Sequence, residues 1–323
     1  MIEDDLPRKV TIGTCWMRVD KVYAGLEQRL GRLVELVDAM GERAAAAGKR
    51  LDIALLPEDC NTAGYTGELD ERAEPLDGPT VTALTAAARR HGTHVLVPLF
   101  TRVDGRTYNS AVLLGRDGAV LGRYDKMHGI EWPEGSGAIE HCCTPGARAA
   151  TFDLDFGRVG VQICFDLLYD DGWQALEEAG AEIVLWPSAY EGVAHLGYRS
   201  WRHGYYVVSC PWRPPCGIYD PSGHQLAHAG PRDEHVLVET IDLAWRLMPW
   251  KSAKDRAKAL AAKYGDRVTI HYRHHEDVWL LWSNDSAWPV DRICREEDLE
   301  PLRPYLERMR QVQDQVRGHP PLV

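Results

Sequence analysis

The sequence has no long hydrophobic run and no excess of positive charge. Apolar runs such as HVLVPLF (94–100) and EIVLWP (182–187) have strand length, far below the ~18 residues of a membrane-spanning helix. The first ten residues, MIEDDLPRKV, are acidic and lack the apolar core of a signal peptide. The net charge of −11 disfavours nucleic acid and anionic membranes as partners. We therefore expect a cytoplasmic protein with neither kind of partner.

Metal-binding and disulfide patterns are also missing. The eight cysteines form no CxxC pair, and the CC at 142–143 does not have the spacing of zinc ligands. In a cytoplasmic protein, reduced thiols are the default. The cluster HYRHH (271–275) has no cysteine or carboxylate at a metal-ligand spacing, which favours a solvated loop or an interface over a metal site. We expect no bound metal.

Strands and helices alternate along the first three quarters of the chain. Leu26, Leu30, Leu33 and Leu36 recur at helical spacing, and the Asp-Gly at 117–118 between two apolar runs predicts a hairpin. The predicted helices cover about 22–48, 80–92, 171–180 and about 196–204; the predicted strands cover 9–16, 51–57, 94–103, 107–115, 119–126, 150–164, 181–187, 205–212, 217–230 and 235–243, with hairpins within 150–164 and 217–230. Three βα units mixed with hairpins predict a mixed sheet, or two sheets, covered by helices.

The character of the sequence changes near residue 245. A charged stretch is followed by the tryptophan-rich VWLLWSNDSAW (278–288) and a predicted helix, DLEPLRPYLERMRQVQDQV (298–316). We expect residues 1–245 to form one domain. Residues 246–323 are expected to be an extension that packs on that domain and on a partner subunit. Exposed tryptophans in the extension would indicate a subunit contact.

Three reactive side chains follow the ends of predicted strands: Glu58, Lys126 and Cys164. Each one alone is ambiguous, because an isolated cysteine at a strand end is usually a buried structural residue. Together they form a chemical set. A thiol is mostly protonated at neutral pH and needs a base, a carboxylate can take its proton, and an ammonium can stabilise an oxyanion. His128 is the nearest histidine, but no segment indicates a Cys-His pair.

Five segments resemble the nitrilase superfamily of carbon–nitrogen hydrolases. They are LLPEDCNTAGY (55–65), YNSAVLLGRDGAVLGRYDKMH (108–128), GRVGVQICFD (157–166), GAEIVLWPSAY (180–190) and IYDPSGHQLAHA (218–229). The resemblance extends from about residue 9 to 243. It implies an α/β fold with a four-layer α-β-β-α sandwich of two mixed sheets and outer helices. It also implies a homodimer or a larger even oligomer, because family members pair through their helical faces.

The resemblance also implies roles for individual residues. Glu58 would be the general base, Cys164 the nucleophile and Lys126 the oxyanion stabiliser, with the backbone N–H of Phe165 as a second oxyanion donor. No metal or organic cofactor is needed. The family has a further glutamate about two dozen residues before the cysteine. Glu140 fits that spacing and is preferred, with Glu134 as the rival and Glu131 as a weaker third.

The implied activity is hydrolysis of a linear amide or an N-carbamoyl compound through a cysteine thioester, with release of ammonia or an amine. The dipeptide at 165–166, Phe-Asp, resembles the amidase and carbamoylase branches more than the nitrilase branch. Two alternatives stay open: a nitrilase that converts a nitrile to an acid and ammonia, and a catalytically silent assembly scaffold. The scaffold is suggested by the altered YRSWRHG (198–204) and the tryptophan-rich tail.

The substrate itself is not predicted beyond a small amide, ureido compound or nitrile. The chain departs from the family pattern at Arg202-His203 and at Asp170-Asp171, where the pocket or a subunit contact is expected. Candidates for substrate contact are Trp132, Glu134, Tyr190, Glu191, His195 and Arg199. Since His195 and Arg199 lie four residues apart, they share a face of a helix and can hold a substrate carboxylate or form a structural ion pair.

Overall fold

The computed structural model describes residues 6–19, 22–250 and 253–318. Their contacts divide them into two compact units. The first unit is Val10–Ile241, and the second comprises the residues from Asp242 onward together with the first few described residues of the chain. Within the described residues, every helix is too short or too polar to cross a membrane.

The first sheet of the larger unit has the strand order β12-β1-β2-β3-β4-β5. Its strands are β1 (Lys9–Cys15), β2 (Ile53–Leu55), β3 (His94–Val103), β4 (Arg106–Leu114), β5 (Val120–Asp125) and β12 (Val236–Asp242). The pairs β1–β2 and β2–β3 are parallel, whereas β3–β4 and β4–β5 are antiparallel. The sheet is therefore mixed. Strand β2 is shorter than the predicted 51–57, since only three of its residues pair.

The second sheet has the order β11-β10-β9-β8-β7-β6. Its strands are β6 (Ala150–Leu154), β7 (Gly157–Val161), β8 (Ile183–Ser188), β9 (Tyr206–Pro211), β10 (Cys216–Tyr219) and β11 (Gln225–Ala229). The three strands β7, β8 and β9 are parallel and the outer pairs are antiparallel. Both hairpins predicted in this region are present. The first one ends earlier than the predicted residue 164, because β7 stops at Val161.

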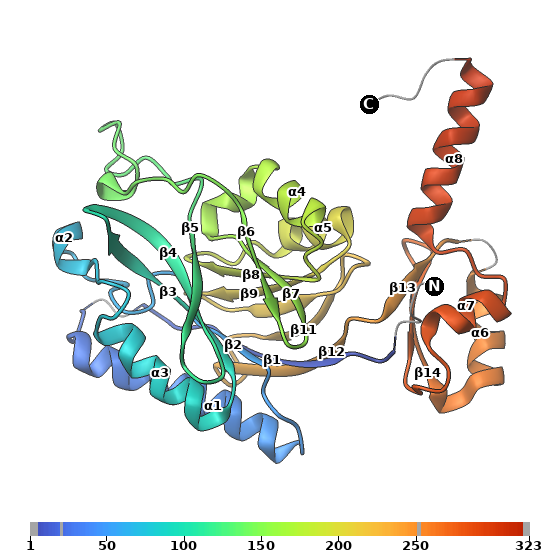
Figure 1. The fold of residues 1–323 in the computed structure, drawn as a ribbon, viewed down its shortest axis with the longest axis horizontal. Coiled ribbons are helices and arrows are strands. Elements are labelled where there is room, and N and C mark those ends of the chain that lie inside the picture. The colour runs from blue at the N-terminus through green and yellow to red at the C-terminus, as the bar shows by residue number, and fades with distance from the viewer. Residues whose placement is uncertain (1–5, 20–21, 251–252, 319–323) are drawn as a thin grey trace. The chain divides into compact units, whose positions relative to one another are not determined.

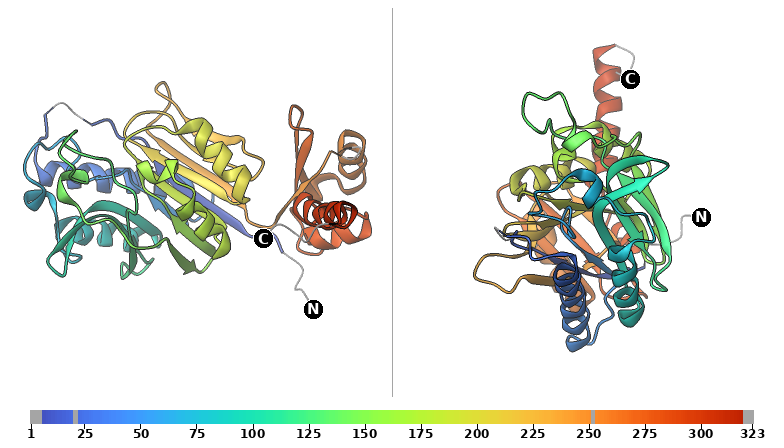
Figure 2. Two further views of the ribbon diagram at one scale, coloured as in Figure 1. Left: turned by 90° about the horizontal axis from the view of Figure 1, so that it is seen from above. Right: turned by 90° about the vertical axis from the view of Figure 1, so that its left-hand side faces the viewer.

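Helices cover the outer faces of the two sheets, as Figures 1 and 2 show. Helices α1 (Leu26–Ala46) and α3 (Pro79–His91) lie on the first sheet, and α4 (Asp171–Glu178) and α5 (Val193–His203) lie on the second. The inner faces meet: the hydroxyl of Thr14 on β1 donates to the carbonyl of Ser209 on β9 at 2.7 Å. The predicted four-layer sandwich is confirmed. A short helix that the sequence did not indicate, α2 (Leu69–Arg72), follows the segment after β2.

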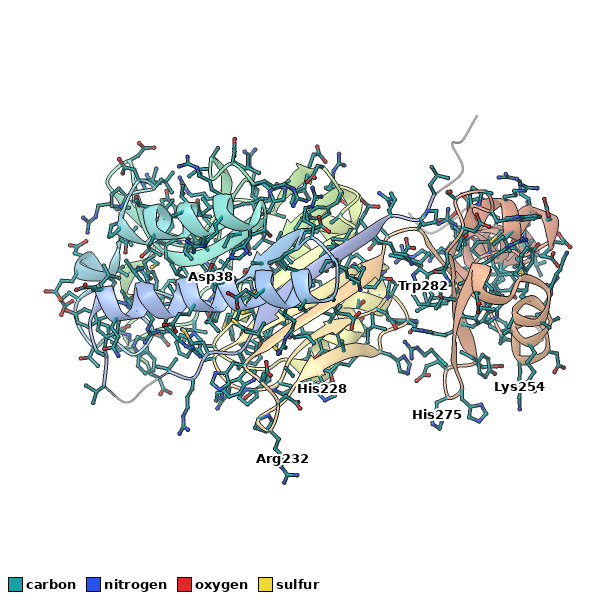
Figure 3. The ribbon with its side chains drawn as sticks, turned by 90° about the horizontal axis from the view of Figure 1, so that it is seen from below. Asp38, His228, Arg232, Lys254, His275 and Trp282 are labelled. Carbon is teal, nitrogen blue, oxygen red and sulfur yellow. The ribbon has the colours of Figure 1, made fainter. Side chains whose placement is uncertain are left out.

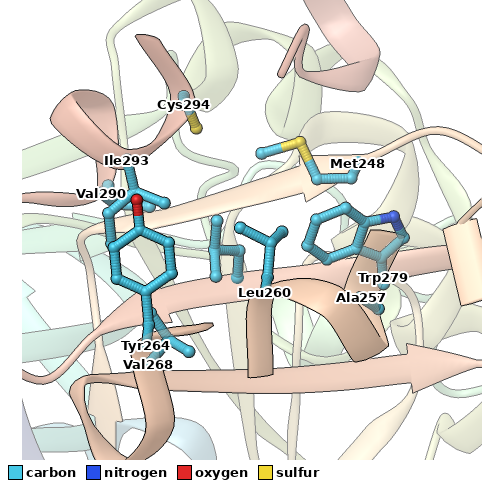
Figure 4. Packing of buried hydrophobic residues seen from close by; sticks show 10 residues of the cluster. Met248, Ala257, Leu260, Tyr264, Val268, Trp279, Val290, Ile293 and Cys294 are labelled. Carbon is cyan, nitrogen blue, oxygen red and sulfur yellow. The ribbon is translucent and has the colours of Figure 1, made fainter. Parts of the chain in front are cut away.

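The second unit has a sheet of its own, with strands β13 (Trp245–Met248), β14 (Val268–Arg273) and β15 (Val278–Ser283) in the order β13-β15-β14. Helices α6 (Ala253–Tyr264), α7 (Val290–Glu296) and α8 (Leu302–Arg317) accompany it. Figure 4 shows its core, which consists of Met248, Ala257, Leu260, Tyr264, Val268, Trp279, Leu281, Val290, Ile293 and Cys294. The predicted helix over 298–316 is present as α8, whereas the sequence indicated neither α6 nor β14.

Tryptophans of the segment 278–288 are not exposed, contrary to one possibility raised by the sequence. Trp279 and Trp282 are only 2% and 4% exposed, because they lie on β15 at the centre of the small sheet. They therefore give no support to a subunit contact, whereas Trp250, at the start of the extension, is 46% exposed. How residues 246–323 pack on the first unit or on a partner stays a prediction.

The histidine cluster at 271–275 divides between a strand and a turn. His271 lies on β14, where its ring meets Trp282 edge-on at 4.7 Å between centroids. His274 and His275 are exposed in the turn before β15, and Figure 3 shows His275 at the tip of this hairpin. Among the described residues, no group of three or more His, Cys, Asp and Glu side chains is arranged to hold a metal ion.

Candidate active site

The end of β5 and the segment after β2 bring Lys126 and Glu58 together. The Lys126 ammonium donates to Oε1 of Glu58 at 2.9 Å, and the two side chains are buried, at 4% and 5% exposure for the residues. Their backbones are fixed by neighbouring elements. The N–H of Lys126 donates to the carbonyl of Asn109 on β4 at 2.8 Å, and the indole of Trp212 donates to the carbonyl of Glu58 at 2.6 Å. Both side chains are therefore held in place, because each is buried and its backbone is fixed by a hydrogen bond.

The long loop after β5 supplies a second carboxylate from Glu140. Its Oε1 accepts from the Lys126 ammonium at 2.5 Å, and Glu140 is buried at the start of a short 3₁₀ turn, Glu140–Cys142. Glu134 and Glu131 are exposed in the outer part of the same loop, where Glu131 accepts from the N–H of Gly137. The structure thus brings Glu140 to Lys126 and leaves Glu134 and Glu131 in solvent.

Asn109 is a member of the site that the sequence reasoning missed. Its side-chain amide donates to Oε1 of Glu58 at 2.9 Å and to Oε2 of Glu140 at 3.1 Å. It therefore links the two carboxylates that also accept from the Lys126 ammonium. The available signal was the Tyr-Asn-Ser run at 108–110, in which an asparagine directly precedes the apolar half of the strand. A buried asparagine in a strand needs such partners.

Cys164 begins a tight 3₁₀ turn, Cys164–Leu168, and two residues separate it from the end of β7 at Val161. Its φ of 48° lies in the left-handed region, where a non-glycine residue is strained unless its surroundings fix it. Asp166 supplies that support. Its Oδ2 accepts from the N–H of Ile163 at 2.8 Å and from the hydroxyl of Tyr124 at 2.7 Å. The indole of Trp186 also donates to the carbonyl of Cys164 at 3.1 Å.

The groups around Cys164 shift the pKa of its thiol in opposite directions. Burial raises the pKa of the Cys164 thiol to about 12, and the Glu58 carboxylate acts in the same direction, whereas the Lys126 ammonium lowers it. Burial lowers the pKa of Lys126, but Glu58, Cys164 and Glu140 more than offset this, so the pKa of Lys126 stands well above its usual value. At neutral pH the site therefore holds a protonated thiol beside a permanent ammonium. Such a thiol becomes a nucleophile only when a base takes its proton.

The predicted substrate-contact residues lie in different surroundings. Tyr190 follows β8, and its hydroxyl is 3.5 Å from the carbonyl of Cys164. Glu191 forms an ion pair with Arg213 at 3.1 Å, and Trp132 is half exposed on the loop after β5. Of these three, Tyr190 has a direct contact with the cysteine segment. Phe165, the predicted source of a backbone N–H, is the second residue of the Cys164 turn.

Arg199 and His195 do not act together. Arg199 is buried on α5, where it pairs with Asp170 and donates to the carbonyls of Leu167 and Tyr169 at 2.9 and 3.0 Å. His195 is exposed on the same helix. The guanidinium of Arg199 is thus engaged in the structural ion pair that was the alternative to substrate binding, and it holds the end of the Cys164 turn.

A half-buried cysteine, with a buried carboxylate and a buried ammonium at the strand ends of a four-layer sandwich, has the composition of a thiol hydrolase site. The chain matches the carbon-nitrogen hydrolase family over residues 11–246 and belongs to that family. It is thus a member of the nitrilase superfamily and a hydrolase of C–N bonds.

Relatives and solved structures agree with this family. The chain is 26% identical to the omega-amidase NIT2 of Danio rerio over 261 residues, which cover 73% of this chain and 90% of that protein. It is 29% identical to the omega-amidase NIT2 of Homo sapiens over 220 residues, covering 61% and 79%.

Two solved structures share its fold. The crystal structure of Saccharomyces cerevisiae Nit3, a member of branch 10 of the nitrilase superfamily, has a TM-score of 0.61 at 20% identity and covers 73% of this chain and 91% of that one. A mutant of the Nesterenkonia AN1 amidase from the nitrilase superfamily has a TM-score of 0.57 at 18% identity and covers 75% and 93%.

Proposed function

We propose that this protein hydrolyses a linear amide of a small molecule, with Cys164 as the nucleophile. The observation that carries the proposal is the position of the Lys126 ammonium. It is buried between the carboxylates of Glu58 and Glu140, and it lowers the pKa of Cys164. The names of the relatives, omega-amidases and an amidase, favour an amide over a nitrile.

The proposed reaction has two halves. Glu58 takes the thiol proton while the sulfur of Cys164 attacks the carbonyl carbon, and the resulting oxyanion accepts from the Lys126 ammonium and the N–H of Phe165. The C–N bond breaks, the nitrogen takes the proton from Glu58, and ammonia or an amine leaves a thioester on Cys164. Glu58 then takes a proton from water, whose oxygen attacks the thioester, and returns that proton to the sulfur as the acid leaves.

Glu140 and Asn109 are positioning residues in this scheme. Two carboxylates and one amide surround the Lys126 ammonium and hold its direction, and the short contact with Glu140 offsets the cost of burying the charge. Trp132, Tyr190 and Glu191 remain the proposed substrate contacts. Tyr190 is the one whose hydroxyl reaches the cysteine segment.

The test is a panel of linear amides, N-carbamoyl acids and nitriles, with ammonia and acid measured as products. We expect acid and ammonia from at least one amide, and none from any substrate with Cys164→Ser. Carbon dioxide together with an amine would identify the N-carbamoyl branch instead. Turnover of nitriles alone would overturn the amidase proposal, and turnover by the Ser variant would overturn the thiol mechanism.

We also propose a homodimer in the cytoplasm. Support for pairing comes from the exposed aromatic side chains of Tyr198 and Trp201 on α5, which are 52% and 50% exposed, because exposed aromatic groups of this kind are typical of interfaces. The eight unpaired cysteines fit a reducing compartment. Light scattering on the eluting protein tests the dimer: Trp201→Asp should give a monomer, and a monomeric unmodified protein would contradict the proposal.

A further inference from the structure

His128 is held between two carboxylates, one of which, Asp166, belongs to the Cys164 turn. Its Nδ1 lies 3.1 Å from Oδ1 of Asp166, and its Nε2 lies 3.3 Å from Oδ2 of Asp171. A carboxylate only accepts hydrogen bonds, and a neutral imidazole donates from one nitrogen only. Both contacts are therefore satisfied together only by the imidazolium.

Asp166 connects this histidine to the Cys164 turn. Its Oδ1 accepts from the N–H of His128 at 2.8 Å as well as from the ring, while its Oδ2 holds the N–H of Ile163 and the hydroxyl of Tyr124. Asp166 is fully buried. Each of its oxygens thus fixes a different segment: Oδ1 holds the chain two residues after Lys126, and Oδ2 holds the residue before Cys164.

The other partners of His128 come from the segment where the sequence leaves the family pattern. The ring of Tyr169 is stacked on the imidazole, with centroids 3.9 Å apart and planes 7° from parallel. Asp171 is the first residue of α4 and its side chain is 60% exposed. An imidazolium over an aromatic face gains a cation–π interaction in addition to the two carboxylate contacts.

We propose that His128, as an imidazolium in contact with Asp166, Asp171 and Tyr169, is a positioning residue. It keeps the Cys164 turn at a fixed position relative to Lys126. The inference rests on the proposed function, since it concerns the same reaction. It adds a proton-dependent element: both carboxylate contacts are satisfied only while both ring nitrogens carry a proton.

The sign of the pH dependence follows from the groups that face the ring. Asp166 raises the pKa of His128, burial opposes this, Asp171 adds to the rise, and the net pKa is higher than usual. A raised pKa means that the imidazolium is present below it and is lost as the pH rises through it. Because the pKa of Cys164 is about 12, ionisation of the free thiol does not fall in the same range. We therefore expect kcat to fall on the alkaline side as His128 loses its proton.

The test compares kcat against pH for three variants. Asp171→Asn removes a carboxylate that is largely exposed. The alkaline limb of kcat should therefore move to lower pH by only about half a unit. Asp171→Glu keeps the negative charge, so its alkaline limb should lie at the same pH as in the unmodified protein. His128→Gln should lower kcat about tenfold and remove the limb, since the charged contacts with Asp166 and Asp171 are lost. As a matched control, His91→Gln removes a histidine on α3 that contacts Asp38 on α1 at 2.7 Å, and the profile should not change.

Two results would overturn the inference. One is an unchanged alkaline limb in Asp171→Asn, a variant that does not depend on the folding of a His128 variant. The other is a His128→Gln enzyme with the limb still present. Cys164→Ser separates this inference from the proposed function: an active Ser variant contradicts the function itself, whereas an inactive one with unchanged limbs in the other variants contradicts only the role of His128.

Discussion

The proposed active site and the C-terminal unit bury opposite kinds of side chain. In the site, Lys126, Glu58, Glu140 and Asn109 are buried in mutual contact at strand ends and in loops. In the C-terminal unit, ten buried hydrophobic residues pack between a three-stranded sheet and its helices (Figure 4). Burying charge costs free energy unless every partner is in place, whereas apolar burial is favourable by itself.

The difference indicates what each region is selected to do. A hydrophobic group of similar volume often replaces a buried ion pair without loss of stability, so the charged cluster is poorly explained by stability alone. The apolar core of the C-terminal unit needs no explanation beyond folding. Substitutions in the site should therefore change activity first, and substitutions in the C-terminal core should change stability first.

The largest expected effect is that of Cys164→Ala on activity. Without the sulfur no thioester forms, so kcat/KM should fall about 10⁴-fold or more, while the free energy of unfolding changes by less than about 1 kcal/mol. Amide hydrolysis and urea unfolding measure the two effects. Cys142→Ala, at an exposed cysteine of the loop after β5, is the matched control and should keep full activity.

Lys126→Met should reduce both activity and stability. The substitution removes the oxyanion donor, and it leaves the carboxylates of Glu58 and Glu140 buried without a cation, which costs about 3–5 kcal/mol. The triple variant Lys126→Met, Glu58→Gln, Glu140→Gln should recover much of the stability but no activity. Unfolding of the single variant at the same urea concentration as the unmodified protein would contradict the claim that buried carboxylates without a cation destabilise the fold.

Trp279→Ala should reduce stability without reducing activity. Its indole packs among residues of the C-terminal unit, so the loss of packing should destabilise that unit by about 3–5 kcal/mol. Hydrogen exchange of β14 and β15 should accelerate, and kcat/KM of the folded protein should stay the same. Trp250→Ala, whose side chain is half exposed, serves as the control and should have little effect.

Glu140→Gln and Glu134→Gln compare two glutamates of one loop. Glu140→Gln weakens the grip on Lys126, and we expect a loss of about 10²-fold in kcat at nearly unchanged KM. Glu134→Gln changes an exposed side chain and should leave kcat within about twofold. Equal losses in the two variants would contradict the assignment of Glu140.

Sequence reasoning identified the strand-end residues because strand ends can be recognised from local patterns. Glu58 and Cys164 each follow an apolar run, and Lys126 follows the second strand of a hairpin that the Asp-Gly at 117–118 indicates. The resemblance favoured Glu140 and kept Glu134 as a rival, since the conformation of a loop depends on contacts made elsewhere in the fold. Asn109 was missed for a similar reason: its role depends on where β4 places its side chain relative to two distant loops.

The C-terminal unit was predicted less well than the site region. Helix α6 lies in a strongly charged stretch that obscures its helical period. Strand β14 does alternate apolar and polar residues, but the sequence analysis treated this segment only as a histidine cluster. The tryptophans of β15 are buried because this strand lies between β13 and β14. Their burial was not predicted, since neither of these neighbours was recognised as a strand from the sequence.

Mass spectrometry of the intact protein, quenched during turnover of an amide, tests the central claim most directly. The acyl group should add to the protein and map to Cys164, and the adduct should accumulate in Glu58→Gln if acylation still occurs, because the base that activates water is missing. The Cys164→Ala protein should carry no adduct. An acyl group on another residue, or turnover by Cys164→Ala at the rate of the unmodified protein, would contradict the mechanism.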